Sequence, residues 1–233
     1  MNDTLRTAGV LGGMGPAATV DFLARVLALT DASSDQQHIR LLVDQNPRVP
    51  DRQEALLRNA RSPGPVLARM AQNLQSIGAD FIVMPCNTAH AFQDDIIAAI
   101  DVPFVSIVDV TLAALPDGAC AGLLTTRGCL DAGVFQPALA ALGLDHRLPT
   151  PAQADALTRF AFDIKAGRRG ADIASGVREI CEQLIGDGAT ALVVACTELP
   201  LVLAADDFTV PLVSSTEELA KKTVRLARGE DAL

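Results

Sequence analysis

The segment GADFIVMPCNT, residues 78–88, is the first indication of the fold. Its apolar part, 81–85, has the length of a buried strand and follows a glycine that ends an amphipathic segment. The stretch GATALVVACTE, 188–198, repeats it, and Cys196 stands where Cys86 stands, at an offset of 110 residues (196 − 86). We interpret the chain as two similar halves that arose by duplication.

Two further pairs of segments repeat at similar offsets. VPFVS (102–106) matches VPLVS (210–214) at an offset of 108, and GVLGGMG (9–15) matches GLLTTRG (122–128) at 113. Three matches in the same order and at nearly the same offset support the duplication.

Apolar runs typical of strands alternate with amphipathic stretches typical of helices. In the first half these are 8–13, 16–30, 39–45, 65–78 and 81–85. Val20, Leu23, Ala24 and Leu27 recur at helical spacing, which predicts that this face packs on the core. The alternation predicts a parallel sheet with helices on both faces.

The predicted fold is therefore α/β, with two pseudo-symmetric domains, each a parallel sheet flanked by helices, and an active site in the cleft between them. We place the first domain at residues 1–98 plus 211–233 and the second at 99–210.

Composition excludes several classes of function. The net charge is −9, and the chain has eight Phe but no Trp or Tyr, which argues against nucleic-acid binding. No uninterrupted apolar run is long enough to cross a membrane, and the first residues lack the features of a signal peptide. Five cysteines, without a CxxC pair, are typical of free thiols in a reduced compartment, so we expect a cytoplasmic protein.

Cys86 and Cys196 each follow a predicted strand, and ligands bind outside the carboxyl ends of strands in open parallel sheets. Polar residues suited to helix capping come next: Asn87 and Thr88 in one half, Thr197 and Glu198 in the other. Backbone N–H groups at such a position would favour a thiolate and lower its pKa from about 8.5 toward neutrality. We expect the two thiols to flank one cleft.

Two acid/base groups on opposite faces of one carbon are what stereoinversion requires. One thiolate removes the α-proton, and the opposite thiol donates a proton to the other face. Asn87, Thr88 and Thr197 would hold the substrate carboxylate and stabilise the developing charge. This scheme needs no cofactor, and neither a phosphate-binding loop motif nor a metal-binding cluster is evident in the sequence.

Most free cysteines are small buried hydrophobic residues. Cys181 shares an apolar helix face, so we expect it in the core; Cys120 is typical of a strand interior, and Cys129 is undecided. A metal site at Cys86 and His90 would lack ligands, because the chain has only three histidines, and we expect His90 to be structural.

Five motifs, GGMGPAAT, NPRVPDR, MPCNTAH, IKAG and ACTEL, together resemble the aspartate/glutamate racemase family, and within it the aspartate racemases. The resemblance covers nearly the whole chain. It implies a cofactor-independent two-domain enzyme, commonly a homodimer, that acts on a small acidic amino acid with Cys86 and Cys196 as its two bases. It also implies that Arg48 and Lys165 bind substrate carboxylate, and that the C-terminal segment 215–229 packs on the first domain.

Some alternatives stay open. Glu198 stands where glutamate racemases carry His, which favours aspartate, although aspartate and glutamate differ by one methylene that the sequence does not resolve. Cys129 stands where relatives usually carry Thr, which leaves the contacts of that loop undecided. The rivals are a dinucleotide-binding enzyme, because GMGPAA (13–18) follows a strand, a non-catalytic amino-acid-binding module, and a maleate isomerase or decarboxylase.

Overall fold

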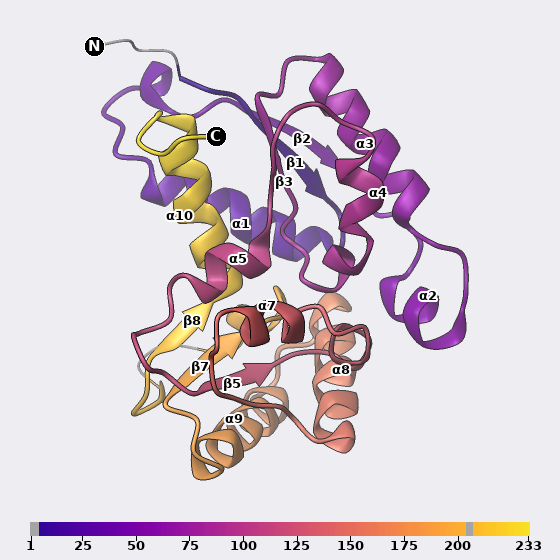
Figure 1. Ribbon diagram of the computed structural model, residues 1–233, viewed down its shortest axis with the longest axis vertical. Coiled ribbons are helices and arrows are strands. Elements are labelled where there is room, and N and C mark those ends of the chain that lie inside the picture. Colours follow the sequence, from indigo (N-terminus) through magenta and orange to yellow (C-terminus); the bar gives the residue numbers. More distant parts are fainter. Residues whose placement is uncertain (1–4, 204–206) are drawn as a thin grey trace.

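The computed structural model describes residues 5–203 and 207–233. It contains two four-stranded sheets in which every pair of neighbouring strands is parallel (Figure 1). The first sheet has the order β2-β1-β3-β4, with strands Leu41–Gln45, Ala8–Gly12, Phe81–Val83 and Phe104–Val105. The second has the order β6-β5-β7-β8, with strands His146–Arg147, Ala121–Leu124, Ala191–Val194 and Leu212–Ser214. The predicted α/β fold with two equivalent halves is confirmed.

Helices cover both faces of each sheet. They are α1 (Pro16–Leu29), α2 (Arg52–Arg58), α3 (Gly64–Ser76), α4 (Gln93–Ile97), α5 (Ile107–Leu112), α6 (Arg127–Asp131), α7 (Gln136–Ala141), α8 (Pro151–Lys165), α9 (Ala171–Gly186) and α10 (Ser215–Ala227). Short 3₁₀ helices lie at Asp35–Gln37 (η1), Thr88–Phe92 (η2) and Leu199–Leu201 (η3). None of the helices in the described parts of the chain is long and apolar enough to cross a bilayer.

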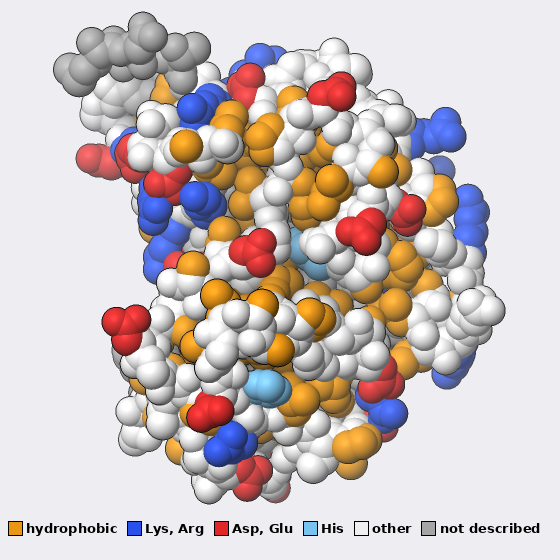
Figure 2. All heavy atoms as spheres, in the orientation of Figure 1, with side chains coloured by type: hydrophobic (Ala, Val, Ile, Leu, Met, Phe, Trp, Pro, Cys, Tyr) orange, Lys and Arg blue, Asp and Glu red, His pale blue; other side chains and the backbone are white. Residues whose placement is uncertain are grey.

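The core has three parts. An outer cluster packs α3 on the first sheet, and a second outer cluster packs α8 and α9 on the second sheet. Between the sheets, α1, α5, α7 and α10 share one central cluster with residues of both sheets. Figure 2 shows acidic and basic side chains interspersed over one face, with apolar side chains reaching the surface between the two halves. The two halves are therefore joined by a common apolar layer.

The repeat extends to single atoms. A Cβ atom added at Gly9 of β1 would lie 2.6 Å from Ile82 Cδ1, and one added at Gly122 of β5 would lie 2.8 Å from Ala189 Cβ. The crowding residues occupy equivalent positions, namely Leu74, Ala79 and Ile82 in the first half and Leu184, Ala189 and Leu192 in the second. Both strands need glycine because a helix and the neighbouring strand approach equally closely in each half.

The two halves exchange their last helices. Strand β4 pairs in the first sheet, but α5, which follows it, packs on α7 of the second half. Strand β8 pairs in the second sheet, but α10 packs on α1, as expected for the segment 215–229. The predicted domain boundaries, 98/99 and 210/211, assign α5 and α10 to the halves on which they pack. They also assign β4 and β8 to the halves whose sheets they do not join. As domain limits they stay a prediction.

One prediction about α1 is wrong for three of its four residues, although Leu23 does pack against the central cluster. Val20 and Leu27, on the face expected to pack on the core, are 57% and 59% exposed, whereas Phe22 and Val26 are buried in the central cluster. Helix α1 carries apolar residues on more than one face, so spacing alone did not select the buried one. The buried face carries the large aromatic ring, which fills the layer that α1 shares with α10.

Candidate active site

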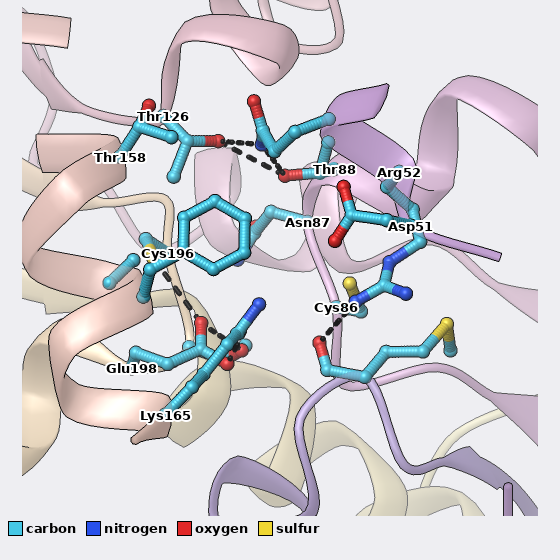
Figure 3. A pocket seen from close by; sticks show the side chains of 15 residues that line it. Asp51, Arg52, Cys86, Asn87, Thr88, Thr126, Thr158, Lys165, Cys196 and Glu198 are labelled. Atoms are coloured by element: carbon cyan, nitrogen blue, oxygen red, sulfur yellow. Dashed lines mark hydrogen bonds and ion pairs between the residues drawn. The ribbon is translucent and has the colours of Figure 1, made fainter. Parts of the chain in front are cut away.

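A pocket lies between the two halves, at the carboxyl ends of β3 and β7. Cys86 and Cys196 line it from opposite halves, and each is only 5% exposed. In Figure 3 they lie on opposite sides of the pocket, and the side chain of Lys165 extends between them. The other lining residues are Met14, Asp51, Arg52, Gln53, Asn87, Thr88, Thr126, Thr158, Ala161, Phe162, Thr197 and Glu198. Of the residues predicted to form the site, the structure brings all but Arg48 together here.

His90 fixes the backbone of Cys86. Its Nδ1 donates to the carbonyl of Cys86 at 2.9 Å, because its Nε2 accepts from the N–H of Ile107 at 3.1 Å. Burial lowers the pKa of His90 to about 4, so the ring is neutral. Both ring nitrogens have backbone partners and none is free for a metal. The predicted structural role of His90 is confirmed.

Asn87 is held from the other half of the chain. Its Nδ2 donates to Ser215 Oγ at 2.8 Å, and Ser215 in turn donates to the carbonyl of Val194 at 2.9 Å. Since the Ser215 hydroxyl donates to that carbonyl, it accepts from Asn87, which fixes the orientation of the amide. Asn87 Oδ1 is buried without a hydrogen-bond partner among the described residues. Asn87 therefore offers a ligand an acceptor at Oδ1, while one N–H of Nδ2 is used by Ser215. Its predicted role as a donor to substrate stays a prediction.

The predicted caps do not form. The chain enters the short 3₁₀ helices η2 and η3 after the two cysteines, and neither Asn87 nor Glu198 makes a side-chain capping bond there. The three-residue η3 after Cys196 aligns few peptide dipoles, so it gives a thiolate little of the stabilisation expected from an α-helix.

Helix α2 of the first half is tied to the second half by Gln53. Its Nε2 donates to Thr126 Oγ1 at 2.8 Å, and its Oε1 accepts from the N–H of Gly128 at 2.7 Å. Thr126 also contacts Thr88 Oγ1 at 3.1 Å. Cys129, which follows Gly128 in the sequence, is buried in the central cluster, and burial raises the pKa of its thiol to about 12. The start of α6 thus contacts α2 through Gly128, and Cys129 itself lies outside the pocket.

The surroundings of Cys196 overturn one prediction. Its thiol donates to Glu198 Oε2 at 3.4 Å. Burial and the adjacent Glu198 charge raise the pKa of Cys196 well above its ordinary value, while Lys165 acts in the opposite direction. The prediction of a pKa lowered toward neutrality is therefore wrong for Cys196, which the fold keeps protonated.

Glu198 is itself buried, with a side chain 5% exposed. Besides the thiol it accepts from the hydroxyl of Thr197 at 3.3 Å and from the N–H of Gly15 at 3.2 Å. Its Oε1 lies 3.6 Å from Lys165 Nζ. Burial lowers the pKa of Lys165 and the charge of Glu198 raises it, with a net rise, so Lys165 is charged.

Sequence reasoning chose Arg48 as the second cation, but the structure places Arg52 in the pocket. Arg48 is exposed on the loop after β2. Arg52 begins α2, whose N-cap Asp51 accepts from the N–H of Glu54 at 2.9 Å. The motif NPRVPDR contains both arginines, and the capping pattern D-x-x-E was the signal that would have placed Arg52 in the first turn of a helix.

Arg52 is 9% exposed and has no carboxylate partner among the described residues. Its guanidinium donates only to backbone carbonyls, those of Val49 at 3.3 Å, Pro50 at 3.1 Å and Met14 at 3.4 Å. A buried guanidinium without an anion is unusual, since buried charges are normally paired. It suits a pocket that receives an anion.

Comparison with known proteins agrees with these features. The model of the Asp/Glu/hydantoin racemase family matches residues 11–223. The chain belongs to this family. The resemblance found in the sequence and the enzyme class that it implied, a racemase, are thereby confirmed.

Among its relatives, a broad-specificity amino-acid racemase of Bacillus subtilis is 29% identical over 227 residues, which cover 93% of this chain and 96% of the relative. A glutamate racemase of Corynebacterium glutamicum is 32% identical over 179 residues, 71% of this chain and 62% of the relative. The solved structure of Picrophilus torridus aspartate racemase superposes with a TM-score of 0.82 at 30% identity, and covers 95% of this chain and 94% of that one.

Proposed function

We propose that this racemase interconverts the enantiomers of an acidic amino acid, aspartate, with Cys86 and Cys196 as its two bases and without a cofactor. One observation carries the proposal: two thiols at equivalent positions of the two halves line the same pocket from opposite sides. A group on each face of the α-carbon is the minimum that inversion requires.

The chemistry is a transfer of two protons. The thiolate of Cys86 removes the α-proton, so that the Cα–H bond breaks and an S–H bond forms. Cys196 delivers its proton to the opposite face of the carbanion, and its S–H bond breaks as the new Cα–H bond forms. The reverse direction exchanges the two roles. No atom is gained or lost, and the negative charge ends on the other sulfur.

The remaining lining residues suit the charges of an acidic amino acid. The cations Lys165 and Arg52 supply carboxylate partners, and charge-assisted bonds of this kind are the strong ones. The unpartnered Oδ1 of Asn87 accepts from the α-ammonium group. A dicarboxylate substrate would use both cations, whereas a neutral amino acid has a single carboxylate for the two.

Aspartate is proposed because the Picrophilus torridus structure is that of an aspartate racemase. The broad specificity of the Bacillus subtilis relative favours a second candidate, racemisation of both aspartate and glutamate. Arg48 stays a predicted carboxylate ligand from the resemblance, and its exposure makes Arg52 the better candidate.

The test is incubation with L- or D-aspartate in deuterated water, followed by chiral chromatography and mass detection. The wild type should racemise both enantiomers, incorporate deuterium at Cα and retain activity after dialysis against a chelator. Cys86→Ala and Cys196→Ala should each lose racemisation, whereas one of them can still exchange the α-proton of a single enantiomer on one face.

The matched control is Cys120→Ala, because Cys120 is half-buried and lies outside the pocket. It should racemise at the wild-type rate. A Cys86→Ala or Cys196→Ala protein that racemises as fast as the wild type would exclude the two-thiol mechanism, and activity that returns only on adding metal would exclude the cofactor-independent one.

A further inference from the structure

We propose that Glu198 is a positioning residue that holds Cys196 as the proton donor of the resting enzyme and so makes the two thiols unequal. The proposal rests on the racemase mechanism above. The observation behind it is a pair of equivalent positions at which the two halves carry different side chains.

These positions lie two residues after each cysteine. At the offset of 110 that relates Cys86 to Cys196, the position equivalent to Glu198 is Thr88. Thr88 is neutral and its hydroxyl contacts Thr126 across the cleft at 3.1 Å. Glu198 instead turns its carboxylate onto the neighbouring thiol, with Oε2 3.4 Å from Cys196 Sγ. The backbone repeats, but among the described residues a carboxylate is hydrogen-bonded to the thiol of Cys196 and none to that of Cys86.

The carboxylate is held where it is. Glu198 Oε1 accepts from the N–H of Gly15 of the other half at 3.2 Å and lies 3.6 Å from Lys165 Nζ. Oε2 serves the thiol and the Thr197 hydroxyl. A buried carboxylate with fixed partners on both oxygens gives the Cys196 thiol an acceptor in one geometry.

This contact sets the order of the proton transfers. The enzyme form with the proton on Cys196 keeps an S–H···carboxylate bond. The form with the proton on Cys86 places a thiolate beside the Glu198 carboxylate, and like charges at this distance in a buried site repel. The free enzyme therefore favours the form that accepts the enantiomer whose α-hydrogen faces Cys86.

Other charged groups face the same sulfur. Lys165 comes from the end of α8 and opposes Glu198, while Arg52 of α2, its N-cap Asp51 and Cys86 line the pocket from the first half. Removing the anion and removing the cation should therefore shift the titration of Cys196 in opposite directions. A merely structural role of Glu198 would not produce such a pair of shifts.

The experiment titrates the substrate-free protein with iodoacetamide across pH and follows alkylation of each cysteine by peptide mass spectrometry. In Glu198→Gln, which keeps the shape of the side chain, the midpoint for Cys196 should fall by about one pH unit or more, a tenfold rise in thiolate fraction at a fixed pH. In Lys165→Met it should rise. Glu198→Asp, which keeps the charge, should restore a midpoint near the wild-type value.

The matched control is Glu182→Gln, which removes one carboxylate from an exposed position on α9 outside the pocket. It should leave the Cys196 midpoint unchanged. The pH profile of kcat for aspartate should move in Glu198→Gln in the same direction as the alkylation midpoint.

An unchanged or higher midpoint in folded Glu198→Gln overturns the inference, and so does a Lys165→Met midpoint that falls. If Glu198→Gln does not fold, the Cys196 midpoint of Glu198→Ala, which also removes the carboxylate, decides. A wild type that racemises while the midpoints do not shift refutes this inference alone. A wild type that racemises no acidic amino acid refutes the proposed function and the inference with it.

Discussion

Replacement of Arg52 by alanine tests which cation holds the substrate. The guanidinium donates to three backbone carbonyls and lacks a carboxylate partner among the described residues, so a bound carboxylate would be its first anion. A hydrogen bond between charged groups contributes about 1.5–3 kcal/mol. At about 1.36 kcal/mol per factor of ten, Arg52→Ala should lower kcat/KM for aspartate roughly 10- to 150-fold.

The assay is kcat/KM for L- and D-aspartate by chiral chromatography, with succinate binding measured by calorimetry as a readout that does not depend on turnover. Arg52→Lys should recover part of the loss, because it keeps the charge but not the two-pronged geometry of the guanidinium. Circular dichroism checks that loss of the bonds to Val49 and Pro50 has not unfolded α2.

The variant to compare with Arg52→Ala is Arg48→Ala. Arg48 is exposed and lies outside the pocket, so its removal should change kcat/KM by less than Arg52→Ala does. The opposite result, a large loss in Arg48→Ala with Arg52→Ala near wild type, would refute the geometric reasoning. It would show instead that the loop after β2 turns Arg48 inward when substrate binds.

Two further predictions concern stability and pH. The pKa of His90 in the folded protein is about 4, below its ordinary value of 6.5. The neutral ring therefore contributes about 3 kcal/mol to the free energy of unfolding above pH 6.5, and this contribution is lost as the pH falls toward 4. His90→Asn should therefore lose less of its unfolding free energy than the wild type between pH 7 and 4.5 in urea titrations, and equal losses would contradict the assignment. Burial raises the pKa of Cys181 from 9.0 to about 12, so the unfolded chain releases this proton first and stability falls as the pH rises from 9 toward 12. Cys181→Ala should be less stable by about 1 kcal/mol at pH 7 yet lose less between pH 8 and 10; an identical alkaline loss in both proteins would contradict this.

The features that could be predicted from the sequence are those that depend on neighbouring residues and that occur in both halves. The run before Cys86 has the length and apolarity of a buried strand, and its second copy before Cys196 shows that the pattern is not accidental. Cys181 was predicted correctly because its helical neighbours leave one apolar face. Where α1 offers more than one such face, only packing against α10 selects the buried one, and that contact lies nearly 200 residues away in sequence.

The state of Cys196 could not be predicted in the same way. The residues after each cysteine suggested a helix whose first N–H groups would stabilise a thiolate. The chain forms only a 3₁₀ turn there, and the side chain of Glu198 turns back onto the sulfur. Glu198, a candidate cap in the sequence, thus acts in the opposite electrostatic sense, because its charge raises the pKa of Cys196. The difference lies in one side-chain direction, which spacing does not encode.

The pocket itself is built from contacts between the halves. Gln53 reaches Thr126, Asn87 reaches Ser215, and the N–H of Gly15 reaches Glu198. The partners in these three hydrogen bonds are separated by 73, 128 and 183 residues, respectively. Each bond involves a residue that lines the pocket, so a relative motion of the halves would change the positions of both thiols, the amide acceptor and the carboxylate together. The exchange of α5 and α10 opposes such motion, because each half packs its last helix against the other through the shared apolar layer. The duplicated fold thereby places two equivalent thiols in one pocket, and under our proposal the side chains that do not repeat decide which of them gives its proton first.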